Sequence, residues 1–477
     1  MGQPGWLGGL RGHVHSWVTC QYFKPGLFIS TACVLIQRYK VYGVLLAVPL
    51  LTTLQYIILY IESSGGQSAQ LIKFDLRTAD FQVPQDTEDS TQDEVRLTPE
   101  RRRNHAAALR MRKILNHCGE LKNPSYIPTP WASYTWINIG LHMVKSFFYT
   151  KFSNISIDSH TLNMEDGGEV FVEVCSDPGL LDDSPIIILL HTITGSSKET
   201  KLYMKQALKR GWRGIVFDRR GHVGKLKSPA FNVLGEADDT VKQVEFVRRK
   251  YPKSFLGMVG ISAGSGLLVN YLGKCGELTP IQAACCLCPA YDISEAFKLM
   301  AQNFPHIDRR MTNAVKKLFI LPNAELLGSH CYDSLEMCAN AATLDEFVRN
   351  HHYFAGCSSA EDYFANNNPM EFIGKVSVPL LVVNSEDDMV CLPQNIREDL
   401  FKYKYGNTLL LRTKRGSHIA YNEGLLGQGS YLPRISLEFL QAARQVLGSN
   451  TDLGRTSRSP STYDSSPNSS NDSGFME

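Results

Sequence analysis

Short apolar runs alternate with helix-like segments between about residues 152 and 447, and this alternation constrains the fold more than any other feature of the chain. The apolar runs lie at residues 185–190, 214–217, 255–259, 281–288, 378–383 and 408–412. The helix-like segments lie at residues 198–209, 236–250, 264–272 and 435–446. Such alternation predicts an α/β fold, with a mostly parallel central sheet that carries helices on both faces. We expect this domain to occupy residues 131–448.

Within that domain, residues 291–375 break the alternation with helical, aromatic sequence. A long segment between two late strands predicts a helical lid insertion. Its aromatic side chains either form a local core or admit acyl chains, and the former is the more common use of such residues. They are Phe297, Phe304, Phe319, Phe347, Tyr353, Phe354, Tyr363 and Phe364.

Residues 41–61 contain no charged side chain and are long enough, at about 1.5 Å per residue, to cross about 30 Å of hydrocarbon. We expect a transmembrane helix here, preceded by a cytosolic or interfacial segment at residues 1–40. Basic residues before the span slightly outnumber those after it, which predicts a single-pass type II protein of an endomembrane or the plasma membrane. If the shorter apolar segment at residues 25–36 forms a hairpin with the span, the domain returns to the cytosol.

Two further segments are expected to lie outside the sheet domain. Residues 62–130 are predicted to be a linker and a basic juxtamembrane region, in which residues 96–113 form either a solvated helix or a contact with anionic headgroups. The aromatic residues 131–149 either lie at the membrane interface or pack on the domain. Residues 449–477 are rich in Ser, Asn, Asp and Pro, which predicts a disordered tail.

Charge and cysteine usage exclude two classes of function. Lysine and arginine number 49 against 47 acidic residues, a net charge of +2, so the chain has no overall field to hold nucleic acid. Cys285, Cys286 and Cys288 resemble a metal cluster, but they occupy an apolar strand where free cysteine behaves as a small buried side chain. We therefore predict no metal and no nucleic-acid partner. The serine chemistry inferred below requires no organic cofactor either, and we make no prediction of the oligomeric state.

The sequence 260–264, Gly-Ile-Ser-Ala-Gly, follows an apolar strand and opens a helix. This context gives the G-x-S-x-G pattern its meaning, because a sharp strand-to-helix turn exposes the serine hydroxyl. Gly260 and Gly264 leave room for the backbone to approach closely at the turn. Ser262 is therefore the predicted nucleophile, against the alternative of a purely structural turn.

A serine nucleophile needs a base and an orienting carboxylate, which follow it in the order acid and then histidine in this architecture. The strand at residues 378–383 ends in an acidic turn, and we choose Asp388 over the neighbouring Asp387 as the orienting acid. His418, in a loop after the next strand, is the predicted base. The alternative for the acids is a solvated turn.

Two backbone amides are expected to stabilise the oxyanion of the reaction. One belongs to Ala263, the residue after the nucleophile, and the other to the loop after the first central strand, where Ile193 is our choice and Thr192 the nearest competitor. His191 in this loop is expected to orient it by hydrogen bonds rather than to act as a base. His222 receives no role.

Several ordered motifs resemble one family. His191, residues 218–221 (DRRG), 235–239 (GEADD), 260–264 (GISAG), 271–273 (YLG) and 378–384 (VPLLVVN), followed by Asp387, Asp388 and residues 416–418 (GSH), look like the membrane-anchored α/β-hydrolase-domain-containing proteins 1, 2 and 3. The resemblance covers about residues 120–445. It implies an α/β-hydrolase fold, a triad on Ser262, Asp388 and His418, a single amino-terminal span, and activity on lipid esters such as acylglycerols or phospholipids.

The chain departs from that family at three positions. Thr192, Ser265 and Ser417 stand where the family usually has glycine. The expected function is a membrane-anchored serine ester hydrolase of the acylglycerol lipase or phospholipase type, which forms an acyl-enzyme and has a lipid ester and the bilayer as partners. The alternative is a catalytically impaired protein that keeps the fold and binds a lipid or another ligand.

Overall fold

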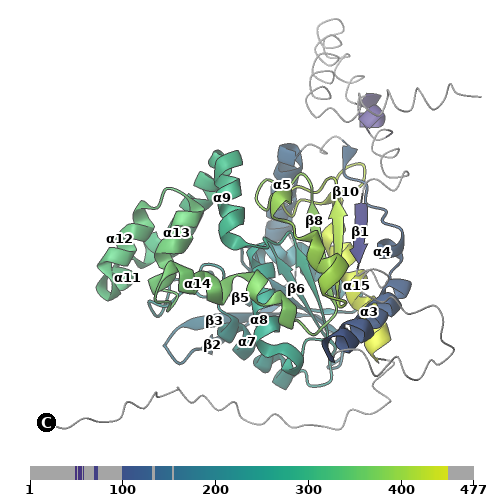
Figure 1. The fold of residues 1–477 in the computed structure, drawn as a ribbon, viewed down its shortest axis with the longest axis horizontal. Helices are drawn as coiled ribbons and strands as arrows, with labels where there is room; N and C mark the ends of the chain where they lie inside the picture. The colour runs from purple at the N-terminus through teal and green to yellow at the C-terminus, as the bar shows by residue number, and fades with distance from the viewer. Residues whose placement is uncertain are drawn as a thin grey trace, which may run out of the picture.

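The computed structural model describes residues 49–50, 52–55, 57, 69–73, 99–130, 135–152 and 155–448. Its strands are β1 (Ala69–Lys73), β2 (Ser156–Asn163), β3 (Glu169–Ser176), β4 (Ile186–Leu190), β5 (Arg213–Asp218), β6 (Leu256–Ile261), β7 (Ala283–Leu287), β8 (Leu380–Ser385), β9 (Thr408–Thr413), β10 (Asn422–Glu423) and β11 (Gly429–Ser430). The first nine form one sheet in the order β1-β9-β8-β7-β6-β4-β5-β3-β2 (Figure 1). β10 and β11 form a separate small hairpin.

The centre of the large sheet is parallel, as the alternation predicts. Strands β4 to β9 pair in parallel with one another, and they coincide with the six apolar runs of the sequence to within a few residues. The three remaining strands are antiparallel additions at the two edges, with β1 on β9 and β2 and β3 beyond β5. β2 is half exposed along its length, so its apolar signal in the sequence is weak.

Helices cover both faces of the sheet. On one face lie α3 (Pro99–His117), α6 (Lys201–Leu208) and α15 (Tyr431–Gly448), and on the other lie α7 (Ala237–Lys250) and α8 (Ala263–Cys275). Alternate residues of β4 divide between the two cores: Ile187 and Leu189 pack on the first side, and Ile188 and Leu190 on the second. This period of two is what a strand buried on both faces requires.

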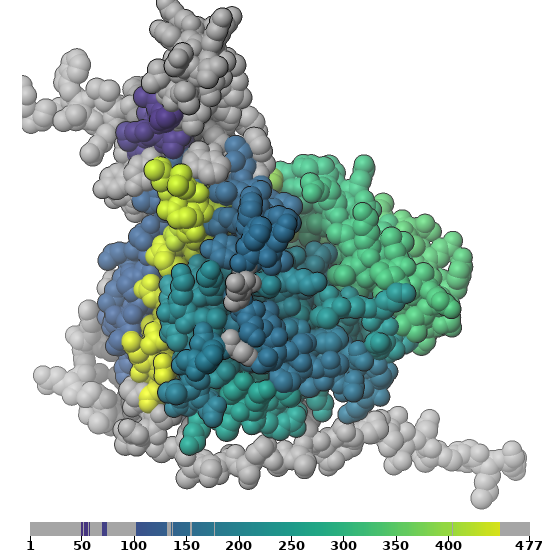
Figure 2. Space-filling view, turned by 180° about the vertical axis from the view of Figure 1, so that it is seen from behind, coloured from purple at the N-terminus to yellow at the C-terminus, as the bar shows by residue number. Residues whose placement is uncertain are grey.

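The segment between β7 and β8 forms a helical subdomain. Its helices are α9 (Ile293–Asn303), α10 (Pro305–Val315), α11 (Ala324–His330), α12 (Tyr332–Asn340), α13 (Leu344–Asn350) and α14 (Ala360–Asn367). These helices project to one side of the sheet. They form the green part of the surface in Figure 2, which shows the molecule from behind. Phe319, Phe347, Phe354 and Tyr363 are fully buried in one apolar cluster. These four aromatic residues are therefore core of the subdomain.

The amino-terminal part of the chain differs from the expected linker at residues 62–130. β1 adds a strand to the edge of the sheet, and α3 packs on α15 through Met111 and Ile114 of its apolar face. The short helix α4 (Gly119–Lys122) and the longer helix α5 (Thr135–Phe152) follow. The body that carries the sheet therefore begins well before residue 131.

Several expectations fall outside the described residues. They concern the segment 1–40, the tail 449–477 and most of the expected span at 41–61, of which only residues 49–50, 52–55 and 57 are described. Among the described residues, no helix has the length and apolar character needed to cross a membrane.

The packing of α3 on α15 predicts that the substitution Ile114→Ala destabilises the whole domain. Ile114 is completely buried, so the substitution removes apolar contacts and leaves a cavity, with an expected loss of about 2–5 kcal/mol in the free energy of unfolding. Leu109→Ala on the same helix is the control, because Leu109 is 41% exposed and its loss should cost less than about 1 kcal/mol. Urea unfolding of the purified full chain measures both. Equal midpoints for the two variants would show that α3 is not part of the folded body.

Candidate active site

Ser262 sits at a sharp turn between β6 and α8. Its backbone dihedral angles are φ 54° and ψ −118°, a region that residues with side chains rarely adopt. The Ser262 amide donates a hydrogen bond to the carbonyl of Leu287 in β7 at 2.8 Å, which fastens the turn to the sheet. The serine side chain therefore projects from the carboxyl end of the central strand, where ligands gather in parallel sheets.

The residues around Ser262 permit this turn because they are small. A Cβ atom at Gly260 would overlap the carbonyl of Gly264, and one at Gly264 would overlap the carbonyl of Leu190 in β4. Ser265, which replaces a family glycine, is accommodated: its hydroxyl donates to the carbonyl of Gly260 at 2.8 Å and accepts from the amide of Leu287 at 3.1 Å. Its side chain strengthens the turn rather than crowding it.

His418 and Asp388 complete a hydrogen-bonded chain with Ser262. The imidazole Nε2 lies 2.8 Å from Ser262 Oγ, and Nδ1 lies 2.9 Å from Asp388 Oδ2. Asp388 Oδ1 also accepts bonds from the amides of Val390 at 2.7 Å and Cys391 at 2.9 Å, so the carboxylate is held from two sides. In the tautomer with the proton on Nδ1, Nε2 is free to accept the serine proton.

Asp387, the alternative orienting acid of the sequence, has a different set of partners. Its carboxylate accepts hydrogen bonds from the amide of Ser417 at 2.8 Å and from the hydroxyl of Thr135 at 3.0 Å. Burial raises the pKa of Asp387 above its ordinary value. The two neighbouring acids thus divide their work, because Asp388 contacts the His418 ring while Asp387 fixes the His418 loop against the start of α5.

Backbone strain in the described chain concentrates at this site. The four non-glycine residues with positive φ among the described residues are Ser262, Cys288, Ser417 and Ile419. Ser262 and Cys288 follow neighbouring strands, and Ser417 and Ile419 flank His418. Each such conformation costs about 1–3 kcal/mol and persists only where the surroundings impose it, which is common at functional sites.

The loop after β4 lies beside the turn at Ser262. The carbonyl of Thr192 accepts a hydrogen bond from Arg219 Nη2 at 2.5 Å and lies 2.9 Å from His191 Nδ1. Because a trans peptide places its carbonyl and its N–H on opposite sides, this anchoring points the amide of Ile193 away from Arg219. Ile193 packs in the same apolar cluster as Ala263, the first residue of α8. The two amides expected to bind an oxyanion therefore lie on adjoining segments.

The buried side chain of Arg219 and its polar neighbours hold that loop in place. Arg219 also donates to the carbonyl of Leu234 at 3.0 Å, and burial lowers its pKa to about 10. Burial holds the pKa of His191 and His222 well below their usual range, so both rings are neutral, and His222 bonds the carbonyl of Gly195 at 2.7 Å. Asp218 accepts from the amide of Ser197 at 2.9 Å, and burial raises its pKa to about 6.

The motif at residues 218–221 is part of the family resemblance, but the sequence alone gives Arg219 no role. An arginine directly after an apolar strand is the signal that could have identified it as a support for the loop, because a guanidinium that becomes buried there must have its donors satisfied.

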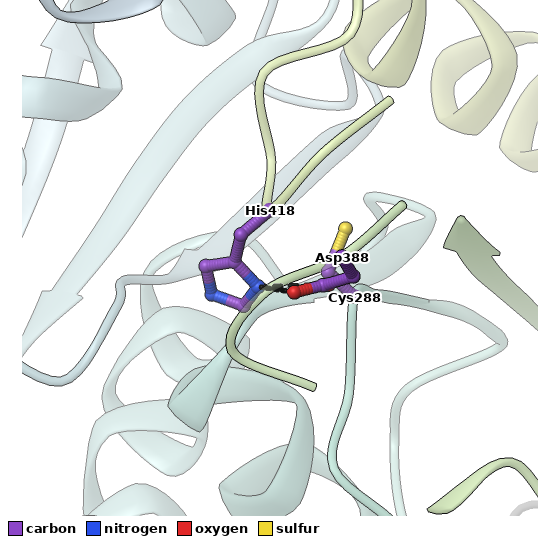
Figure 3. A group of neighbouring side chains, drawn as sticks. All are labelled: Cys288, Asp388 and His418. Carbon is purple, nitrogen blue, oxygen red and sulfur yellow. Dashed lines mark hydrogen bonds and ion pairs between the residues drawn. The ribbon is translucent and has the colours of Figure 1, made fainter. Parts of the chain in front are cut away.

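One group of side chains at the site has the donor atoms of a metal ligand set. The Sγ of Cys288, a carboxylate oxygen of Asp388 and a ring nitrogen of His418 all lie within 4.8 Å of one another (Figure 3). Burial and the charge of Asp388 raise the pKa of Cys288 well above its usual range, so the thiol is neutral. Asp388 and His418 already bond each other, and the chain that continues to Ser262 is the better-defined arrangement. Cys285 and Cys286 pack on opposite faces of β7.

The site is nearly closed. Ser262 is 8% exposed and the side chain of His418 is 12% exposed. Apolar residues from the helical subdomain join Ile193 and Ala263 in one cluster. A substrate that reaches Ser262 therefore requires movement of this cover or passage along its edge.

The fold and the site define the class of protein. Residues 185–424 match the family described as alpha/beta hydrolase fold, so the chain belongs to the α/β-hydrolase family. Among the similar proteins are three named "Phospholipase ABHD3" of Homo sapiens, "Monoacylglycerol lipase ABHD2" of Danio rerio and "Protein ABHD15" of Homo sapiens. The resemblance inferred from the sequence motifs is confirmed at the level of the family.

The similarity extends over most of the first relative. The human phospholipase is 25% identical over 345 residues, which cover 69% of this chain and 82% of that protein. The zebrafish lipase is 25% identical over 288 residues, covering 55% and 66%, and the human ABHD15 protein is 28% identical over 218 residues, covering 45% and 46%.

The turn at Ser262 predicts very different effects for two glycine substitutions on α8. Gly264→Ala forces a Cβ against the backbone of β4 and should lower the free energy of unfolding by about 1–3 kcal/mol or more. Gly266→Ala is the matched control, because its Cβ would meet the side chain of Pro369 at 3.3 Å and alanine favours the helix by about 0.5–1 kcal/mol. The urea midpoint of Gly264→Ala should lie far below that of the wild type, and the midpoint of Gly266→Ala should lie close to it or above it. A harmless Gly264→Ala would contradict the close approach of α8 and β4.

Proposed function

We propose that this protein is a serine hydrolase that cleaves carboxylic esters of lipids and that Ser262, His418 and Asp388 are its catalytic triad. The observation that carries the proposal is the hydrogen-bonded chain from Ser262 Oγ through His418 to Asp388, set on a strained strand-to-helix turn. A serine held in this way has the base that activates it and a side chain that projects from the turn, as a nucleophile requires.

The chemistry follows from the positions of these atoms. His418 Nε2 takes the proton of Ser262 as Oγ attacks the ester carbonyl, and Asp388 stabilises the imidazolium that forms. The amides of Ala263 and Ile193 donate to the oxyanion, helped by the amino-terminal end of α8. The imidazolium then protonates the leaving alcohol, and water activated by His418 releases the acid from the acyl-enzyme. No metal or organic cofactor enters these steps.

The substrate class rests on the relatives and on the cover of the site. Two relatives are named as a phospholipase and a monoacylglycerol lipase, both of which act on lipid esters. Apolar residues of the helical subdomain surround Ile193 and Ala263, which suits a fatty acyl group and would disfavour a charged peptide. We infer an acylglycerol or a phospholipid as the substrate.

The proposed location is a membrane, with a single span at residues 41–61 and the amino terminus in the cytosol. The support is in the sequence, where the uncharged run and the excess of basic residues before it meet the requirements of a signal anchor. A membrane location would also bring the site to a lipid substrate.

The proposal predicts that the full chain releases fatty acid from detergent-dispersed monoacylglycerol or phospholipid and that Ser262→Ala abolishes the release. Loss of the nucleophile should lower the rate by about 10⁴-fold or more, because acyl-enzyme formation is no longer possible. Ser329→Ala, an exposed serine on α11, is the matched control and should retain wild-type activity. Fatty acid is measured by mass spectrometry.

Two results would count against the proposal. Undiminished release by Ser262→Ala would place the nucleophile elsewhere. Binding of the lipid by a folded wild type that releases no acid would favour the ligand-binding alternative.

A further inference from the structure

The outer face of α5 is apolar and exposed. Met143, Val144, Phe147, Phe148 and Phe152 are each between 53% and 64% exposed, and their spacing places them on one side of the helix. Leu425 and Leu426, in the loop between β10 and β11, are 55% and 76% exposed. We refer to these seven residues as the α5 apolar face. A monomeric soluble protein rarely leaves so many large apolar side chains together in water.

The β10–β11 loop belongs to the same surface because it is fastened to α5. Lys145 on α5 donates to the carbonyl of Gly429 at 2.6 Å and to the side chain of Asn422 at 2.9 Å. The backbone at Gly427 packs against Leu141, so closely that an added Cβ would lie 2.6 Å from the leucine side chain. The two leucines at the loop tip are therefore held beside the helix.

Basic residues border the carboxyl-terminal end of this face. Lys151 lies over the rings of Phe147 and Phe152, at 5.8 and 5.5 Å. Lys201 donates to the carbonyl of Thr150, and Lys205 lies 5.7 Å from the ring of Tyr149. Residues 143–152 and 197–205 together contain five lysines and one acidic residue, Glu199. Apolar rings bordered by lysines suit an anionic lipid surface, where rings enter the headgroup region and ammonium groups meet phosphates.

The inner face of the same helix holds the active-site loop. Thr135, the first residue of α5, donates to Asp387, and its carbonyl accepts from the hydroxyl of Ser417 at 3.0 Å. A surface that binds α5 therefore lies one helix away from His418. In Figure 1, α5 and β10 lie at the upper end of the molecule.

We propose that the α5 apolar face docks into the surface of a phospholipid bilayer, with its bordering lysines against lipid phosphates, and presents the edge of the active-site cover to the lipid. The docking does not depend on turnover, but its consequence for substrate access rests on the proposed function. Substrate would pass from the bilayer to Ser262 beside α5, without crossing bulk water.

The test places a tryptophan on the face. The full-length variant Phe148→Trp is placed in vesicles of phosphatidylglycerol and phosphatidylcholine that have brominated acyl chains. The bromine should strongly quench the fluorescence of the added indole. Leu278→Trp is the matched control, since Leu278 is 81% exposed but precedes β7, at the opposite end of the parallel strands. Its added fluorescence should be unaffected. Equal quenching in the two variants would overturn the proposal. A dimer in detergent that protects the Phe148→Trp indole would also overturn it, because a second copy of the chain would then cover the face.

A second measurement separates docking from catalysis. The double variant Phe147→Ser/Phe148→Ser should react with a fluorophosphonate in detergent at the wild-type rate but hydrolyse lipid in vesicles about tenfold more slowly. Leu278→Ser should match the wild type in both. Unchanged hydrolysis of vesicle lipid by the double variant would overturn the access route. If the wild type lacks all hydrolase activity, the proposed function fails, and the tryptophan quenching still decides the docking.

Discussion

The strained turn at Ser262 depends on the close approach of α8 to β4, and the rest of the site is built around that approach. Because no side chain intervenes at Gly264, the helix can pack directly on the backbone of Leu190. Burial of the two apolar layers on either side of the sheet stabilises the arrangement against the strain of the turn. The serine hydroxyl is then aimed at His418 by the fold itself, and no local flexibility is needed to bring the two together.

Two neighbouring carboxylates after β8 show how a short turn can carry two separate tasks. Asp388 contacts the His418 ring, whereas Asp387 bonds the loop backbone and α5. Because α5 is attached in this way to the loop that carries His418, any surface that binds the helix is close to the base of the proposed triad. Arg219 plays a comparable part on the opposite side by anchoring the carbonyl of Thr192 and so orienting the amide of Ile193. The threonine at this position is compatible with that orientation, since the anchoring uses only its backbone.

The sequence predicts the parts of the fold that have a strong apolar pattern. Strands β4 to β9 are buried on both faces, so each appears as a continuous apolar run, and the order of Ser262, Asp388 and His418 follows from their places after such strands. β2 escaped prediction because it is half exposed and polar. The basic sequence of α3 predicts either a solvated helix or a contact with headgroups, and the complete burial of Ile114 against α15 depends on residues far away in the chain. The tasks of Asp387 and Arg219 depend on contacts between segments far apart in the chain, which no local pattern encodes.

The central claim is that Ser262 is activated by His418, and reaction with a fluorophosphonate tests it most directly. The wild-type protein should label, and digestion followed by mass spectrometry should place the adduct on Ser262. His418→Ala should label at least about 100-fold more slowly because the serine loses its base, whereas His330→Ala, an exposed histidine on α11, should label normally. A folded wild type that does not label, or an adduct on another residue, would contradict the account.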